Sequence, residues 1–188
     1  MKKLIAVAAV LLAAGAAQAD VTRYYTTFAP EGGGGRTGSG SAFASFDDAT
    51  NEFSFFADFS GLSGLTTQAH FHCCTTTAFS GTAGVAVDSP SLPIPLGVSA
   101  GSFGTLLDLD DASNFNPTFV TASGGLGAAI TRFKAGLDSG KVYLNIHTST
   151  FPGGEIRGFM LVPEPSSAAL VLLAMAALGV AGARSRRA

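Results

Sequence analysis

The sequence contains no tryptophan, only two cysteines and three histidines in 188 residues, and 13% charged residues. Its cysteines are adjacent rather than spaced Cys-x-x-Cys, so thioredoxin-like redox chemistry has no support. No Gly-x-Ser-x-Gly elbow occurs, and the glycine-rich stretch at 31–41 lacks the Lys-Ser/Thr ending of a phosphate-binding loop. The common signatures of hydrolases and nucleotide-binding enzymes are therefore missing, and we expect a protein that is not an enzyme.

The first nineteen residues have the features of a secretory signal peptide. Lys2 and Lys3 form a short positive region, an apolar run follows at 4–14, and Ala17-Gln18-Ala19 supplies the small residues that signal peptidase needs. We expect cleavage before Asp20. The apolar run is too short to favour a permanent N-terminal anchor.

The C-terminal end carries a second sorting pattern. Pro163, Glu164 and Pro165 precede an apolar run at 168–183, and an arginine-rich cluster at 184–187 follows it. At about 1.5 Å per residue the run spans about 24 Å, near the lower limit for a membrane helix. Basic residues directly after such a helix favour a cytoplasmic location for that end.

This order of parts at 162–188 resembles the PEP-CTERM sorting signal of Gram-negative bacteria. The resemblance implies transient anchoring in the inner membrane, recognition of the Pro-Glu-Pro motif by exosortase, and delivery to the cell surface or the extracellular matrix. Exopolysaccharide or another surface protein would then be a possible partner. An ordinary tail anchor is the alternative interpretation.

Residues 20–162 lie between the two signals and have a length suited to one domain. They include six basic and twelve acidic residues, a net charge near −6. This charge argues against nucleic acid or an anionic membrane surface as a partner. The expected export also permits disulfide bonds.

The composition and the residue patterns predict a mainly β domain. The whole chain has 24 glycines and 15 phenylalanines, which favours a turn-rich fold with phenylalanine as the main bulky core residue. Loops are expected at 30–41 and 89–97, where glycine or proline is frequent. We expect an antiparallel β-sandwich with one or two short helices. Strands are predicted at 21–28, 52–59, 66–74, 102–109, 141–148 and 155–161, and a helix at 128–137.

The three histidines occur in strands where alternation places them on one face. His70 and His72 lie two residues apart, so both point to the same side of their strand. In the 141–148 strand, the apolar residues leave Asn145 and His147 on the opposite, polar face. By the same argument Glu155 and Arg157 face away from Ile156. One polar face would hold all of these residues if the three strands are neighbours.

Three imidazoles that converge are a reasonable ligand set for Cu²⁺ or Zn²⁺. Glu155 would then complete the set or orient one of the ligands. The competing interpretation is an ordinary solvated sheet face, on which histidine and asparagine form hydrogen bonds across strands.

Cys73 and Cys74 directly follow the His-x-His pair and have two interpretations. In an oxidising compartment they would form a vicinal disulfide, which is the only intramolecular pairing of two cysteines. Alternatively, Cys74 would be a thiolate ligand beside the histidines. We favour the disulfide because of the expected export.

Two blocks of the domain resemble the CHRD family, which is named from chordin. These blocks are "GLSGLTTQAHFH" at 61–72 and "SGKVYLNIHTSTFPGGEIRGFM" at 139–160. The resemblance covers most of 22–161 and implies a secreted β-sandwich domain without established catalysis, in a binding or structural role. The four glycines after Glu31 depart from the prolines usual in the family, which puts the first hairpin in doubt.

The His-x-His pair is also similar to the pair that Cu,Zn-superoxide dismutase carries on its β-sandwich. Three histidines are too few for the full dismutase site. A single copper or zinc site, dismutase-like or redox-active, remains the alternative function.

Overall fold

The computed structural model describes residues 21–88 and 91–163. The expected signal peptide and most of the expected sorting segment, including Glu164 and Pro165, lie outside these residues. The strands are β1 (Val21–Pro30), β2 (Ser39–Asp47), β3 (Glu52–Ser60), β4 (Thr66–His72), β5 (Val85–Val87), β6 (Gly101–Asp108), β7 (Tyr143–Thr148) and β8 (Ile156–Phe159). The helices are the 3₁₀-helix η1 (Ala112–Asn114) and the α-helices α2 (Pro117–Ser123) and α3 (Leu126–Asp138).

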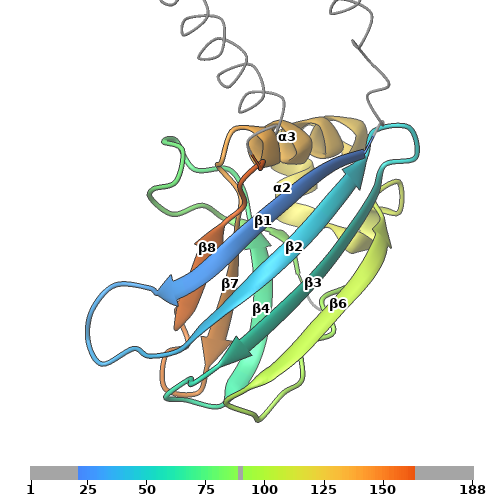
Figure 1. The fold of residues 1–188 in the computed structure, drawn as a ribbon. Helices are drawn as coiled ribbons and strands as arrows, with labels where there is room; N and C mark the ends of the chain where they lie inside the picture. The colour runs from blue at the N-terminus through green and yellow to red at the C-terminus, as the bar shows by residue number, and fades with distance from the viewer. Residues whose placement is uncertain (1–20, 89–90, 164–188) are drawn as a thin grey trace, which may run out of the picture.

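All eight strands form one antiparallel sheet in the order β5-β4-β7-β8-β1-β2-β3-β6. The sheet curls so that β1, β2, β3 and β6 form one wall and β8, β7 and β4 form the other (Figure 1). Between β1 and β8 only Ala29–Arg157 and Pro30–Ile156 are paired. The mainly β, antiparallel character with two short helices is as expected. The two layers, however, belong to one continuous curled sheet and are not separate sheets.

Phenylalanine rings fill the space between the two walls. On β3, alternate residues are buried, and the ring of Phe53 packs edge-on against Phe71 of β4 with centroids 5.2 Å apart. Phe133 of α3 also packs edge-on against Phe53, at 5.3 Å. Helices α2 and α3 thus cover one end of the curled sheet (Figure 1). This packing fixes which side chains of β4 point into the core. The alternate side chains of β4 therefore point outward.

Strand β2 was not predicted, because its sequence is rich in glycine, serine and alanine. The expected loop at 30–41 ends earlier, and β2 begins at Ser39. A Cβ atom on Gly40 would lie 2.1 Å from the carbonyl oxygen of Asp58. Glycine therefore allows β2 and β3 to approach closely at this point, and it marks a strand rather than a loop. The helix predicted at 128–137 lies within α3.

Candidate metal centre

The three strands that carry the candidate residues are neighbours, since β4, β7 and β8 are adjacent in the sheet. His70 lies opposite Asn145, and Asn145 lies opposite Arg157. His147 pairs with Gln68 and is therefore one step diagonal to His70. Diagonal side chains of this length are within reach of each other. The three histidines, Asn145 and Arg157 therefore share one face, which is the outer face of this wall, and Glu155 does not share it.

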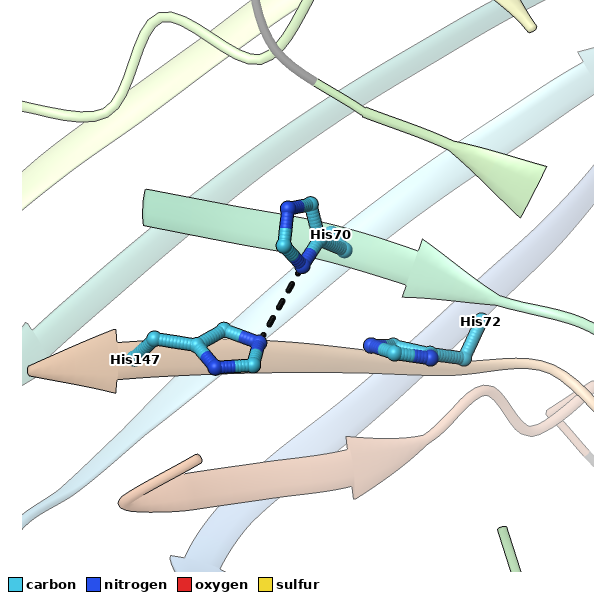
Figure 2. Close-up of side chains that lie close together, drawn as sticks. All are labelled: His70, His72 and His147. Carbon is cyan, nitrogen blue, oxygen red and sulfur yellow. Dashed lines mark hydrogen bonds between the residues drawn. The ribbon is translucent and has the colours of Figure 1, made fainter. Parts of the chain in front are cut away.

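The three imidazole rings converge above β4 and β7 (Figure 2). The Nδ1 atom of His70 lies 3.1 Å from Nε2 of His147, and one ligand atom from each ring lies within 4.8 Å of the others. Two nitrogens bound at 2.0–2.1 Å to a tetrahedral ion are about 3.4 Å apart. The first pair is close to this spacing, and a pair at the full 4.8 Å must approach by about 1.4 Å.

Hydrogen bonds to two carbonyl oxygens determine which nitrogens carry protons. Nδ1 of His72 lies 2.9 Å from the carbonyl oxygen of Ala83, and Nδ1 of His147 lies 2.8 Å from that of Pro152. A carbonyl oxygen only accepts, so both Nδ1 atoms donate, and in the neutral rings both Nε2 atoms keep a lone pair. His147 Nε2 then accepts from Nδ1 of His70. Carbonyl-oriented imidazoles of this kind are common among metal ligands.

His72 contributes a buried nitrogen without a partner. Its Nε2 atom has no hydrogen-bond partner among the described residues, although the residue is only 9% exposed. Leaving a buried polar atom unpaired costs about 1–3 kcal/mol. A metal ion bound at the lone pair would remove this cost. The unpaired atom therefore fits a ligand role.

Burial also keeps two of the imidazoles uncharged. Desolvation, helped by the neighbouring His147 and His72, lowers the pKa of His70 to about 4. Desolvation likewise lowers the pKa of His72, against the raising effect of its hydrogen bond to Ala83. Neutral imidazole is the form that binds metals. These two rings are thus in their binding form at neutral pH.

Asn145 and Arg157 share the outer face but have other partners. The Nδ2 atom of Asn145 donates to Glu31 at 2.6 Å, and a guanidinium nitrogen of Arg157 lies 3.0 Å from the same carboxylate. The guanidinium also lies over the ring of Tyr143, 5.0 Å from its centroid. Tyr143 in turn stacks on His72 with centroids 4.7 Å apart. This network supports the histidines from one side.

Glu155 does not join the histidines. It is fully buried, and its carboxylate accepts hydrogen bonds from Ser63, Gly64 and Thr148. Burial alone would raise the pKa of Glu155, but these hydrogen bonds outweigh it and hold the pKa below the usual range. Through these hydrogen bonds the carboxylate links the 61–64 loop to β7. No carboxylate or thiol belongs to the histidine group within 21–88 and 91–163.

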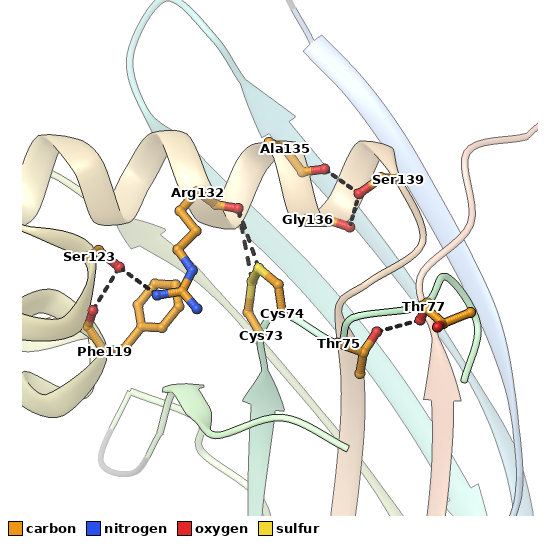
Figure 3. Close-up of a disulfide and its surroundings, with 10 residues drawn as sticks. All are labelled: Cys73, Cys74, Thr75, Thr77, Phe119, Ser123, Arg132, Ala135, Gly136 and Ser139. Carbon is orange, nitrogen blue, oxygen red and sulfur yellow. Dashed lines mark hydrogen bonds between the residues drawn. A yellow bond between two sulfur atoms is a disulfide. The ribbon is translucent and has the colours of Figure 1, made fainter. Parts of the chain in front are cut away.

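The two cysteines face helix α3 (Figure 3). Their sulfur atoms are paired with each other and lie 3.9 and 3.5 Å from the carbonyl oxygen of Arg132. Strand β4 ends at His72, so the alternation that would have placed Cys74 beside the histidines stops before it. The thiolate-ligand interpretation of Cys74 therefore has no geometric support.

Sequence reasoning missed three groups around the histidines. Tyr143 shares the face of Asn145 and His147, and the alternation along this strand could have identified it. The carbonyl oxygens of Ala83 and Pro152 carry no residue-type signal. Only the folded loops place them beside the imidazoles.

The fold and this face define the molecule as an antiparallel β domain with a buried histidine cluster on its outer face. Comparison with family models gives a match to the CHRD domain over residues 25–160. The chain therefore belongs to the CHRD domain family. The resemblance stated from the two sequence blocks is confirmed. No curated protein and no solved structure matched the chain.

A second family model, the PEP-CTERM protein-sorting motif, matches residues 161–187. This motif implies an exported protein that exosortase sorts to the cell surface. No helix within the described residues is long and apolar enough to cross a membrane. The apolar run at 168–183 lies outside them.

Proposed function

We propose that the CHRD domain of this surface protein is a non-enzymatic binding module that holds one Cu²⁺ or Zn²⁺ ion through His70, His72 and His147. The observation that carries the proposal is the buried, unpartnered Nε2 atom of His72, which lies in a cluster with two other imidazoles. Imidazole nitrogen suits both metals, and divalent copper generally binds such a site more tightly than zinc.

Each histidine has a defined part in this site. His72 and His147 present Nε2 lone pairs, because their Nδ1 atoms donate to carbonyl oxygens. His70 would supply Nδ1 as the third nitrogen once the proton of this atom moves to Nε2, which breaks the hydrogen bond to His147. The imidazoles are 6–9% exposed, which leaves little room for a substrate beside the ion and favours binding over catalysis.

The test is metal content and affinity of the full chain, purified as a Gram-negative host exports it. Copper and zinc are measured by elemental analysis and by calorimetric titration. The variants are His72→Gln and His147→Gln. Gln68→Ala is the matched control, because Gln68 is exposed on the same strand and opposite His147.

One equivalent of metal is expected in the wild type and in Gln68→Ala. Each histidine variant should bind at least tenfold more weakly, since an ion loses one of only three protein ligands. A chain that takes up neither metal, or a His72→Gln variant with wild-type affinity, would refute the proposal.

The proposed route to the surface is separable from metal binding. Signal peptidase would remove residues 1–19, the tail would hold the chain briefly in the inner membrane, and exosortase would then act at Pro163-Glu164-Pro165. Fractionation of a Gram-negative host with and without exosortase tests this. Retention in the inner membrane in both hosts would contradict it.

A further inference from the structure

A row of exposed aromatic side chains crosses the outer face of the other wall of the sheet. Tyr25 of β1 pairs with Phe43 of β2, and Phe43 pairs with Phe56 of β3. These side chains are 40%, 61% and 53% exposed. On β6 the row meets Gly104, which has no side chain, and Leu106, which lies opposite Ser54, is 59% exposed. With strands about 4.8 Å apart, the three aromatic side chains span about 10 Å.

Polar side chains line both sides of this aromatic row. On one side Arg23, Ser45 and Ser54 face outward on β1, β2 and β3, and the two hydroxyls lie 2.7 Å apart. On the other side Ser41 donates to Asp58, which pairs with Ser102 of β6. The face therefore offers a flat apolar strip between two rows of hydrogen-bonding groups.

An open hollow joins the aromatic row to the first polar row. It has a volume of about 320 Å³, and its lining includes Arg23, Ser45, Ser54 and the rings of Phe43 and Phe56. A pyranose ring has an apolar face of C–H groups and a rim of hydroxyls. The hollow offers an aromatic surface for the first and hydrogen-bonding side chains for the second.

The size of this face is that of a functional patch, and its charge bears on which polymer it binds. At about 200 Å² per side chain, the four exposed residues present about 400 Å² of apolar surface, the size of the largest apolar patch on a typical monomer, which is often functional. The outer positions also carry Asp58 and a row of Asp47, Glu52 and Asp108, against the single cation of Arg23. This excess of negative charge disfavours acidic polymers.

We propose that this outer face of β1, β2, β3 and β6 is a binding site for a neutral polysaccharide. Sugar rings stack on Tyr25, Phe43 and Phe56, and their hydroxyls bond to the flanking serines, Asp58 and Arg23. The site lies on the opposite wall from the histidines, and it does not depend on metal. A surface protein with this face would attach to the glycan layer around the cell.

The test is electrophoresis of the full chain, as exported by its host, through native gels that contain a soluble polysaccharide. The probes are hydroxyethylcellulose and galactomannan, which are neutral, and alginate, which is acidic. The variants are Phe43→Ala with Phe56→Ala, and Arg23→Gln. Phe79→Ala is the matched control, because Phe79 is 55% exposed and lies outside the row.

At least one neutral probe is expected to retard the wild type and Phe79→Ala. The double variant should lose roughly tenfold in affinity, as removal of aromatic anchors from a binding surface does. Arg23→Gln should weaken retardation without changing the oligomeric state. Each of three results would overturn the proposal: no retardation by either neutral probe, retardation by alginate alone, or a dimer that Phe43→Ala dissociates.

Discussion

Helix α3 contains two glycines whose replacement by alanine should have opposite effects on stability. A Cβ atom on Gly136 would lie 2.7 and 2.8 Å from the sulfur atoms of Cys74 and Cys73, and 3.0 Å from a methyl group of Val142. A Cβ atom on Gly127 would meet nothing within 4 Å. Neither glycine has a positive φ, so backbone conformation does not require glycine at either position.

The magnitudes follow from two terms. Alanine is favoured over glycine in a helix by about 0.5–1 kcal/mol, and this gain applies to both substitutions. At position 136 the added methyl group also overpacks the contact with the cysteines, which costs about 1–3 kcal/mol. Gly127→Ala should therefore stabilise the domain. Gly136→Ala should be less stable than Gly127→Ala by about 1–3 kcal/mol.

Urea unfolding followed by far-ultraviolet circular dichroism measures this difference. The two curves should have similar slopes and different midpoints, since the change affects packing and not the surface exposed on unfolding. Equal stabilisation by the two substitutions would refute the reasoning. It would mean that α3 does not pack on the cysteine pair at the distances described.

Three further predictions concern Glu155, the histidine cluster and the cysteine pair. Glu155→Gln should lower the free energy of unfolding at pH 7 by about 1–3 kcal/mol, because an amide cannot accept all the hydrogen bonds of the carboxylate. In the folded protein the pKa of Glu155 lies below its unfolded value of about 4.3. The carboxylate therefore contributes fully to the free energy of unfolding above pH 4.3, and this contribution is lost as the pH falls through the folded pKa. Wild-type stability should fall faster than that of Glu155→Gln between pH 5 and pH 3, and parallel pH profiles would contradict this. Zn²⁺ or Cu²⁺ at 100 times its dissociation constant should stabilise the domain by about 2.7 kcal/mol, a shift in melting temperature that a chelator reverses. At the same metal concentration, His147→Gln should be stabilised by about 1.4 kcal/mol or less, because it binds at least tenfold more weakly. Titration of the denatured, exported chain should find no free thiol before reduction and two after it, and two free thiols without reductant would exclude the Cys73–Cys74 bond.

The candidate site could be predicted from the sequence because alternation along a strand is a local property. The positions of His70, His72 and His147 follow from which neighbouring residues are apolar, and adjacency of β4 and β7 was the only further condition. The partners of Glu155 could not be predicted in this way. Two of them, Ser63 and Gly64, come from a loop more than ninety residues earlier in the chain, and only the closed fold brings this loop to the carboxylate.

The fold class was also predictable, but the shape of the sheet was not. Alternating phenylalanines on β3 indicate a strand with one buried face, whichever sheet it belongs to. Whether the two walls are separate sheets depends on the pairing of Ala29 and Pro30 with β8. Nothing in these residues indicates that pairing, since proline in a strand usually marks an edge. Strand β2 was missed because its small residues have low strand propensity. They form a strand because their size lets β2 approach β3 closely.

The pairing of Tyr25 with Leu161 determines how the domain is presented to its surroundings. Two backbone hydrogen bonds, of 2.9 and 2.8 Å, hold the first half of β1 against Leu161, the first residue that the sorting-motif model matches. Both ends of the domain therefore leave it at the end that α3 covers, where Tyr24 also donates to Asp138. A tether through the tail would therefore hold the domain by that end. Both outer faces of the curled sheet lie along the sides of the domain and not at that end, so such a tether would leave them uncovered.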